Sequence, residues 1–490
     1  MVITFRKTSM LFRIALLVLL TFVVSCGGGD SGSVTGGGAQ PPGNNTPPPG
    51  GGTVAAFTKQ FGGQRFDGAS CTAVDANENI YVAGNTWGTV DVLNPNPDPT
   101  ASTADIFVAK YNAAGTLQWI RQFGSPLDDY ATGIAVDNTG NVIVVGYTFG
   151  DLFGSNIDPL RFTTDYFVLK IDVGGAQIWA LQDGTNDSDE VCGVTTDKND
   201  NIYIAGGSRG PIAGIANVGD FDAFIASYTS AGALRWGGKR SSGVNRANRD
   251  FARAVVVDEQ RNYLYVTGDF YVGVRDPDIY VERRNPDNGD LNSDNWNVDP
   301  LTGLGFNAFI FGTVSTDNTP QFDFSTGIAK DRNGNVYVGG YNIRNDNNAT
   351  SNAGDVTFEL FKLDTSGNLI WHNYKPAGPH PGNEARGVVV DSMMDVYLIG
   401  YTSIALGADP ALGGTDGFIM QFDGDTGATL WTKQFGTAGN DRAFGIAFFD
   451  NRAGNNFYVV GESFGSMDGN PNFGGYDAFL VKYNQFGVRL

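Results

Sequence analysis

The sequence predicts an all-β protein: a seven-bladed β-propeller built from four-stranded antiparallel blades. The first observation is a recurring segment, which reads Asp-Arg-Asn-Gly-Asn-Val-Tyr-Val-Gly-Gly from Asp331 to Gly340. The second is its spacing, because the seven copies start 62, 60, 61, 73, 60 and 59 residues apart, which indicates one structural unit per step. The third is that no segment beyond residue 25 has a convincing helical period. The other copies begin at Asp75, Asp137, Asp197, Asp258, Asp391 and Asp450.

Each unit contains four short runs of alternating apolar residues, bounded by turn residues. In the second unit these runs are Gly133–Asp137, Asn141–Gly146, Asp165–Lys170 and Gly175–Trp179. Period-two patterns of this length predict β-strands, which we name a to d from the inside of the ring outward. Four-stranded antiparallel units repeated around a circle are typical of a propeller.

Two further repeated features predict how the strands pack. A small residue stands near the end of strand a in most units, such as Gly133, Gly193 and Gly445, and it would allow the innermost strands to converge. Five units carry a Gly-x-x-x-Trp pair, such as Gly175 and Trp179. We expect the Gly to form the c–d turn and the Trp to seal one blade against the next.

The two ends of the repeat region predict how the ring closes. The last unit stops at Leu490, before its own Trp strand, and the first unit is preceded by the orphan run Phe57-Thr-Lys-Gln-Phe61. This run matches Trp431-Thr-Lys-Gln-Phe435 except for its first residue. We therefore expect residues 57–61 to form strand d of the last blade, which removes an exposed sheet edge, and residues 54–490 to form one propeller.

The start of the chain predicts a lipoprotein signal peptide over residues 1–25. Basic residues precede an apolar run from Ile14 to Val24, which is shorter than the roughly 20 residues that span a bilayer. The run ends in Val23-Val24-Ser25-Cys26-Gly27, which resembles the bacterial lipobox, in which the Cys becomes the lipidated first residue. We expect a lipid on Cys26 and, because Gly follows it, delivery to the outer membrane. The alternative is an ordinary secretory signal with an incidental Cys.

Residues 26–53 consist almost entirely of Gly, Pro, Ser, Thr, Asn and Gln after the Cys. Such a segment cannot bury apolar surface, so we predict a disordered tether between the anchor and the propeller.

Charge and composition exclude several classes of function. The net charge of −20 argues against nucleic acid and anionic lipid as partners, since both require a basic face, and leaves the anchor as the membrane contact. The chain has only two histidines, His372 and His380, and this small number nearly excludes His-based metal or acid–base chemistry.

Cys71 and Cys192 fall on blades that are not adjacent, so we expect two buried thiols and no disulfide. We expect a monomer.

Three motifs resemble functional sites but fit local structure better. Gly206-Gly-Ser208-Arg-Gly210 and Gly461-Glu-Ser463-Phe-Gly465 match the esterase pattern, but they occupy a repeat slot that no helix follows. Asp-x-Asn-x-Asn runs such as the one at Asp75 resemble half a Ca²⁺ loop, but they lack the distal Glu and fit an Asx-type hairpin turn with Asn or Gly at positive φ. Asp423 to Trp431 resembles the tryptophan-docking repeat of quinoprotein dehydrogenases, which have eight blades and a vicinal Cys pair that this chain lacks.

A recurring acid stands just before strand a. We expect these residues to ring the mouth of the central channel, where they could bind a cation such as Ca²⁺; the alternative, which we favour, is that each accepts local backbone N–H bonds. Asn in the sixth unit fits the local role, because an Asn side chain can still accept a backbone hydrogen bond. We expect no cofactor. The residues are Asp67, Asp129, Asp189, Asp250, Asp323 and Asp441, with Asn383 in the sixth blade.

The fourth unit predicts a candidate binding loop. Most units use 16 to 21 residues between strands b and c, whereas the fourth uses 39, from Gly268 to Asn307. Arg and aromatic residues on a loop over a rigid scaffold are typical of recognition surfaces, although a self-packed flap is the alternative. The candidate residues are Tyr271, Arg275, Tyr280, Arg283, Arg284 and Trp296.

The Asp-x-x-Gly-Asn-x-Tyr-x-x-Gly units resemble the bacterial seven-bladed β-propeller (SBBP-type) repeat family over residues 54–490. The resemblance implies the fold and an address in the cell envelope, and no settled activity. We therefore expect a non-catalytic, lipid-anchored envelope module that binds a protein or a glycan. The alternatives are a scaffold for outer-membrane protein assembly, by analogy with eight-bladed lipoproteins, and an enzyme that uses paired carboxylates on a polysaccharide.

Overall fold

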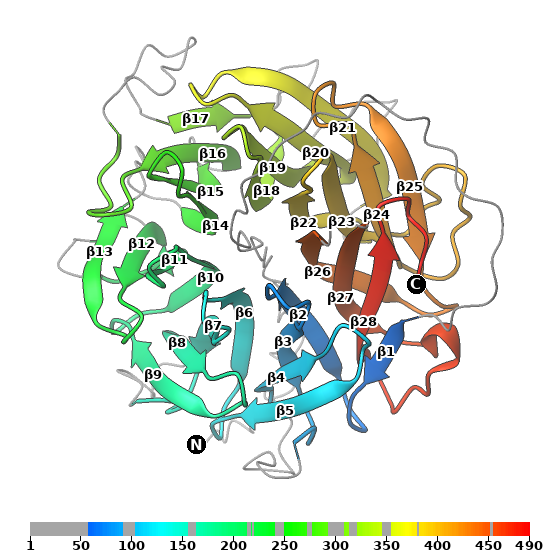
Figure 1. Ribbon diagram of the computed structural model, residues 1–490, viewed down its shortest axis with the longest axis horizontal. Coiled ribbons are helices and arrows are strands. Elements are labelled where there is room, and N and C mark those ends of the chain that lie inside the picture. The colour runs from blue at the N-terminus through cyan, green and yellow to red at the C-terminus, as the bar shows by residue number, and fades with distance from the viewer. Residues whose placement is uncertain are drawn as a thin grey trace, which may run out of the picture.

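The computed structural model describes residues 57–91, 103–154, 163–212, 217, 220–240, 249–271, 277–292, 308–312, 321–344, 354–379, 382–450 and 454–490. Seven four-stranded antiparallel sheets are arranged around one axis, as Figure 1 shows. The predicted seven-bladed, all-β propeller is therefore confirmed. A single 3-10 turn, η1 (Met467–Gly469), is the one helical element among the described residues.

The strands follow one another from the inside of each blade outward. In blades one to three they are β2 (Asp67–Val74), β3 (Ile80–Thr86), β4 (Asp105–Tyr111), β5 (Leu117–Phe123), β6 (Asp129–Val136), β7 (Val142–Thr148), β8 (Asp165–Ile171), β9 (Gln177–Asp183), β10 (Asp189–Thr196), β11 (Ile202–Ser208), β12 (Asp222–Tyr228) and β13 (Leu234–Arg240). In blades four to six they are β14 (Phe251–Asp258), β15 (Tyr263–Tyr271), β16 (Pro277–Arg284), β17 (Ala308–Phe311), β18 (Phe322–Lys330), β19 (Val336–Ile343), β20 (Asp355–Leu363), β21 (Leu369–Pro379), β22 (Glu384–Val390), β23 (Val396–Thr402), β24 (Asp416–Phe422) and β25 (Thr429–Phe435).

The seventh blade is completed from the other end of the described chain, as predicted. Its sheet contains β26 (Asp441–Asp450), β27 (Asn455–Ser463), β28 (Asp477–Asn484) and, outermost, β1 (Thr58–Phe61). β1 pairs antiparallel with β28, and Figure 1 shows the two side by side. The Phe57 ring packs against Gly115 in the c–d turn of blade one, as Trp119 packs against Gly175 one junction later. Phe57 thus takes the place of the missing Trp.

The hydrophobic core is divided among the junctions between blades. Each of seven buried clusters combines side chains from two neighbouring blades. Strands b and c are buried on both faces, as in β7 and β8, which explains why they read as nearly continuous apolar runs. Removing this apolar surface from water is the main force that holds the ring together.

The repeated Trp residues seal the junctions as predicted. Trp179 in β9 donates its Nε1–H to the carbonyl of Ser230 in the next blade at 3.1 Å. Equivalent bonds run from Trp119 to Val173, Trp236 to Pro286, Trp371 to Gly424 and Trp431 to Gln485. Near the axis the strands converge at small residues, since a Cβ built on Gly445 would lie 2.9 Å from the Cα of Cys71.

Blade four differs from the prediction. β16 pairs with β15 along its whole length and is strand c, so strands b and c are joined by residues 272–276. The long segment, 285–307, joins strands c and d instead. The prediction placed it wrongly because β16 contains Glu282, Arg283 and Arg284 in succession, which read as a polar loop. These charges are buried, and Arg284 Nε donates to Glu282 Oε1 at 2.9 Å.

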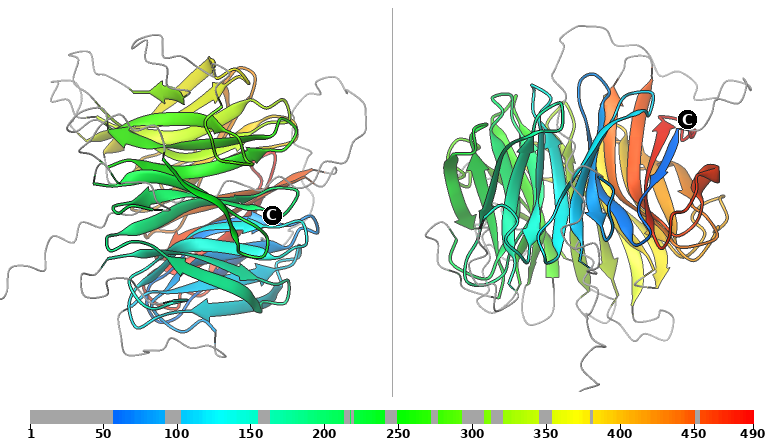
Figure 2. Two further views of the ribbon diagram at one scale, coloured as in Figure 1. Left: turned by 90° about the vertical axis from the view of Figure 1, so that its left-hand side faces the viewer. Right: turned by 90° about the horizontal axis from the view of Figure 1, so that it is seen from below.

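The alternation of strand direction gives the disc two different faces. The a–b hairpins and the c–d turns, such as residues 137–141 and 172–176, lie on one face, which we call the hairpin face. The b–c and d–a connections, such as residues 124–128, lie on the other, which we call the connection face. Figure 2 shows the strands running between these two faces. No helix in the described part of the chain is long and apolar enough to cross a membrane.

Candidate functional site

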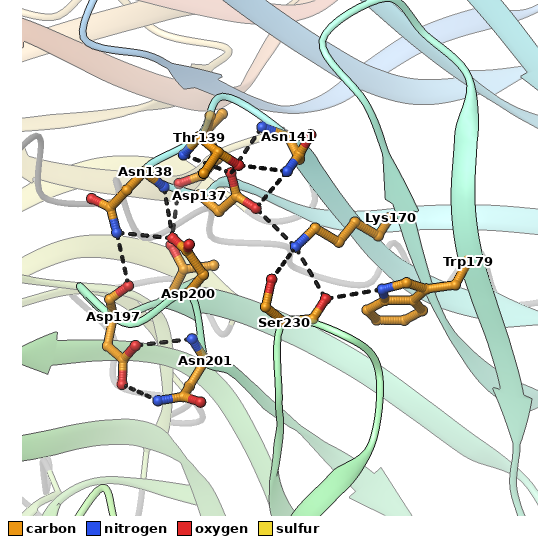
Figure 3. Close-up of polar contacts among 12 residues, drawn as sticks. Asp137, Asn138, Thr139, Asn141, Lys170, Trp179, Asp197, Asp200, Asn201 and Ser230 are labelled. Atoms are coloured by element: carbon orange, nitrogen blue, oxygen red, sulfur yellow. Dashed lines mark hydrogen bonds and ion pairs between the residues drawn. The ribbon is translucent and has the colours of Figure 1, made fainter.

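The Asp residues that begin the repeated segment lie on the hairpin face and are used by their own turns. Asp137 Oδ1 accepts the backbone N–H groups of Thr139 and Asn141 at 3.0 and 2.9 Å, and its Oδ2 accepts the Asn141 amide and pairs with Lys170 Nζ at 2.8 Å (Figure 3). Asp75, Asp197 and Asp331 make the same backbone bonds. The Asx-type turn is therefore confirmed.

These hairpins also connect neighbouring blades. Asn138 donates its backbone N–H and its side-chain amide to Asp200 Oδ1 of the next blade, both at 2.9 Å (Figure 3).

The prediction that Asn or Gly supplies the positive φ of these turns was too narrow, because Glu78 (φ 59°), Asp200 (φ 60°) and Met394 (φ 73°) also adopt a positive φ. At Glu78 this conformation directs the carboxylate toward the last blade.

Glu78 closes the ring on the hairpin face. Its Oε1 accepts from Asn456 Nδ2 at 2.6 Å, Tyr458 OH at 2.6 Å and Lys482 Nζ at 3.0 Å, all in blade seven. Burial alone would raise the pKa of Glu78, but these bonds outweigh it and hold the pKa below its usual range. One carboxylate of blade one is therefore the shared acceptor for three donors of blade seven.

The acids predicted to ring the channel mouth are buried at the connection face. Asp67, Asp129, Asp189, Asp250, Asp323 and Asp441 are each at most 4% exposed, and Asn383 is 0% exposed. Asp67, Asp129, Asp189 and Asp441 each accept the backbone N–H of the residue four positions earlier. Asn342 donates to Asp323 at 2.9 Å, and Asp250 also has an interaction partner. The favoured local role is thus confirmed for these four members, and all six acids are buried.

At several junctions between blades, a second buried carboxylate lies beside the recurring acid that precedes strand a. Asp165 begins strand c of blade two, and a Cβ built on Gly184 would lie 2.7 Å from its Oδ1 and 2.9 Å from Oδ2 of Asp189. The two carboxylates therefore flank a position where no side chain fits. Burial raises the pKa of Asp67, Asp105 and Asp189 to about 6 and that of Asp129 to about 7, and the neighbouring carboxylate adds to the rise in each case.

A glutamine in strand d bonds both to the strand-c carboxylate of such a pair and to the backbone of the b–c connection. Gln122 Nε2 donates to Asp105 Oδ2 and to the Gly88 carbonyl, both at 2.8 Å, and its Oε1 accepts the Val90 N–H at 2.9 Å. The same pattern recurs at Gln60, Gln182 and Gln434. These glutamines hold the b–c connections beside strand d, and the repeat pattern alone did not predict this role.

The two serines of the esterase-like pattern have structural roles. Ser208 donates to Asp189 Oδ1 and bonds to the backbone of Gly210 two residues later. Ser463 makes the same turn with Gly465. The structural interpretation of Gly-x-Ser-x-Gly is therefore confirmed. Cys71 and Cys192 are buried thiols that are not joined in a disulfide, as expected.

The candidate residues of blade four do not form a loop surface together. Tyr280, Arg283 and Arg284 lie in β16 and are buried, with Arg283 stacked 4.1 Å from the Tyr263 ring centroid. Tyr271 ends β15. Arg275, Trp296 and the lipidation candidate Cys26 lie outside the described residues. The predicted recognition loop is therefore wrong for its three described strand-c residues.

Aromatic side chains from three consecutive blades instead gather on the connection face. Trp87 contacts the rings of Phe66 and Tyr130 at centroid distances of 6.2 and 6.1 Å, and Phe66 stacks on Tyr476 at 5.7 Å. The series continues from Tyr130 to Tyr147 and Phe149 and from Tyr476 to Phe464. We call this series the aromatic arc: Phe66, Trp87, Tyr130, Tyr147, Phe149, Phe464 and Tyr476.

The arc combines exposure with fixed geometry. Phe66 and Phe464 are 52% and 53% exposed. Backbone bonds hold the chain segments that carry these rings, because Trp87 N–H donates to the Phe66 carbonyl at 2.9 Å and Asp67 N–H donates to the Tyr476 carbonyl at 2.7 Å. Arg442 lies beside the arc, with its guanidinium 5.6 Å from the Tyr476 centroid and its Nη1 2.9 Å from Glu462.

A repeat position could have revealed the arc. The residue after Ser or Thr in the Gly-x-Ser/Thr-x-Gly slot is Phe464, Trp87 and Phe149 in blades seven, one and two, which are consecutive only once the ring closes. No group of three His, Cys, Asp or Glu side chains that could hold a metal ion occurs in the described part of the structure.

Comparison with known proteins finds a β-propeller repeat in part of the chain. Residues 118–154, from β5 to just beyond β7, match the SBBP family model, a beta-propeller repeat. The chain is similar to the regulatory protein FlaEY of Caulobacter vibrioides, with 24% identity over 402 residues, covering 73% of this chain and 39% of that protein. It is also similar to the uncharacterized WD repeat-containing protein L264 of Acanthamoeba polyphaga mimivirus, with 26% identity over 184 residues.

The chain spans 39% and 13% of the lengths of these two relatives. Among solved structures it is similar to the Pan2 WD40 domain of Neurospora crassa, with TM-score 0.41 and 10% identity, covering 84% of this chain and 88% of that one. It is also similar to a europium-containing methanol dehydrogenase, with TM-score 0.38 and 11% identity, covering 79% and 90%.

Proposed function

We propose that this chain is a non-catalytic binding module of the bacterial cell envelope, anchored by a lipid on Cys26, and that it recognises a partner through the connection face. The observation that carries the proposal is the aromatic arc. Exposed aromatic side chains beside an Arg are typical of the residues that dominate binding energy at interfaces. A rigid scaffold that presents them is typical of a recognition surface.

The position of the first strand supports this orientation. β1 is the outer strand of blade seven and starts at Thr58 on the hairpin face, where the Phe57 N–H bonds to the Leu490 carbonyl. A tether over residues 26–53 would therefore join the disc at the hairpin face. The arc on the opposite face would then be directed away from the anchored membrane, toward a protein or glycan.

The recognition face is tested by crosslinking in intact cells. A photoactivatable residue placed at Phe66 or Phe464 of the full-length chain is expected to give a discrete crosslinked product. The same residue at Phe486, a 43% exposed Phe in the turn that follows strand c of the same blade on the hairpin face, is the matched control. Equal products from both faces, or none from the arc, would contradict the proposal.

The anchor is tested separately. A Cys26→Ser chain is expected to lose incorporation of labelled palmitate and to leave the membrane fraction, because one thioether and its acyl chains provide the attachment. Unchanged fractionation of this variant would remove the anchor from the proposal and leave the recognition face untouched.

A further inference from the structure

The aromatic arc offers ring faces but few polar groups at its most exposed positions. Phe66 and Phe464, the two members that are more than half exposed, have no hydrogen-bonding atoms in their side chains. A neutral glycan presents hydroxyl groups that need hydrogen-bond partners on the protein when water is excluded. The most exposed part of the arc therefore offers ring faces for stacking and no hydrogen-bonding groups of its own.

Three arginines of this chain already show how a cation sits on aromatic rings near the axis. The guanidinium of Arg442 lies 5.5 Å from the Tyr401 centroid in addition to its contact with Tyr476. Arg386 lies 5.5 Å from both Tyr401 and Phe444. Arg253 lies 4.4 Å from Phe251. A guanidinium over an aromatic face is attracted by the ring quadrupole, so the outer rings of the arc can receive a cation from a partner in the same way.

The charge of the chain favours a cationic partner as well. Its net charge is −20. The long-range field of such a protein attracts basic ligands and repels nucleic acid, acidic glycans and acidic peptides. Near the arc, the exposed Asp151 and the half-buried Asp128 carry negative charge on the connections of blades one and two. The charge of Arg442 is paired with Glu462, and the exposed Arg65 precedes Phe66.

The chain segments that carry the arc are held by hydrogen bonds. The backbone N–H groups of Trp87 and Asp67 are bonded, and the connection that carries Phe464 is held by Gln60, whose Nε2 donates to the Gly465 carbonyl at 2.8 Å. Preorganised aromatic side chains lose little conformational entropy on association, which leaves more of the contact energy as affinity.

We propose that the aromatic arc binds a basic segment of a partner protein, whose Arg or Lys side chains stack on the rings while its apolar side chains cover Phe66 and Phe464. The inference rests on the proposed recognition role of the connection face and names the class of partner. A neutral glycan and an acidic polymer are the competing classes.

The test measures binding of defined probes to the full-length chain solubilised in detergent. The probes are a labelled peptide of alternating Arg and Leu, the same peptide with Glu in place of Arg, and a hexasaccharide of N-acetylglucosamine. We expect the Arg peptide to bind, the Glu peptide and the hexasaccharide not to bind, and the affinity to fall as NaCl is raised from about 50 to about 300 mM.

Matched variants assign the binding to the arc. We expect Phe66→Ser combined with Phe464→Ser to weaken the Arg peptide by roughly tenfold or more, since both exposed stacking surfaces are lost. Phe486→Ser removes an exposed Phe from the hairpin face and is expected to bind like the unaltered chain. Circular dichroism of each variant checks that the fold is retained.

Four results would overturn the inference: no binding of the Arg peptide, equal binding of the Glu peptide, binding of the hexasaccharide alone, or an equal loss in Phe486→Ser. If crosslinking from Phe464 still captures a partner while the Arg peptide fails to bind, the recognition role of the connection face is supported and the proposal of a basic partner is wrong. If crosslinking fails while the peptide binds in an arc-dependent way, the proposed cellular role is wrong and the proposed binding chemistry of the arc is supported.

Discussion

The two faces of the disc use the same residue type, aspartate, in opposite ways. On the hairpin face Asp137 lies beside Lys170 and accepts bonds from its own turn, so that its pKa is lowered even though burial alone would raise it. On the connection face Asp129 accepts bonds from Thr148 and Ser125, yet its burial and the nearby Asp105 raise its pKa to about 7. The partners around each carboxylate, and not the residue type, therefore decide whether its pKa is lowered or raised in the folded chain.

The largest effect is expected where a hairpin-face carboxylate closes the ring. Glu78→Ala leaves the hydroxyl of Tyr458 and the ammonium of Lys482 without their shared acceptor. We expect a loss of about 2–4 kcal/mol in the free energy of unfolding at pH 7, measured by urea denaturation. Glu78→Gln keeps an acceptor and is expected to lose less than half as much.

The pH dependence of this effect has a defined sign. The pKa of Glu78 is lowered in the folded chain, so its contribution is present above the unfolded pKa of about 4.3 and is lost as the pH falls through the folded value. The difference between the unaltered chain and Glu78→Ala should therefore shrink below pH 4. A difference that stays constant down to pH 3 would contradict the assigned role.

The connection face predicts the opposite dependence. The pKa of Asp129 is about 7 in the folded chain, against about 3.9 when unfolded. Its favourable contribution is therefore fully present below about pH 4 and is lost as the pH rises through 7. Asp129→Asn removes this titration, and we expect it to be about 1–2 kcal/mol more stable than the unaltered chain at pH 8 and nearly equal to it at pH 4.5.

Asn383 is the natural precedent for this change, because its Oδ1 accepts from the Thr402 hydroxyl at 2.7 Å and the Ser403 N–H at 2.9 Å. Asp137→Asn on the hairpin face is the matched control and should lower stability at pH 8, since it removes the ion pair with Lys170. A loss of stability at pH 8 from both substitutions would remove the contrast between the faces.

A smaller effect is expected in blade six, where the hairpin face breaks its own pattern. Asp395 stands where other blades have an Asn such as Asn141, and burial together with the charges of Asp391 and Asp423 raises its pKa to about 7. Asp395→Asn would replace this repulsion with an amide that can donate to Asp391. We expect a gain of about 1 kcal/mol at pH 8 by urea denaturation. A decrease would show that the Gln421 bond to Asp395 matters more.

The smallest effect on stability is expected on the exposed arc. Phe464→Ser should change the free energy of unfolding by less than about 0.5 kcal/mol, because the ring is 53% exposed. Phe57→Ala, at a ring that is 9% exposed and seals the closing junction, should cost about 3 kcal/mol in the same assay. Comparable losses from the two substitutions would indicate that the arc is part of the core.

Much of the fold was predictable because its signals are local and repeated. The match between Phe57–Phe61 and Trp431–Phe435 predicted a pairing between residues more than 400 positions apart. Blade four was misread because a strand that buries Glu282 and Arg284 against each other looks like a solvated loop. The arc was missed because Phe464 and Trp87 become neighbours in space only after the last blade meets the first.

The sequence by itself determined the number of blades, the four strands in each and the strand that closes the ring, because turn residues and apolar alternation act within a few residues of each other. Only the tertiary structure decided which carboxylates are buried in pairs, which bond to their own turns and which aromatic side chains remain exposed together. Those outcomes depend on the approach of one blade to the next, and the distances between side chains across a junction are not encoded in the pattern of either blade alone.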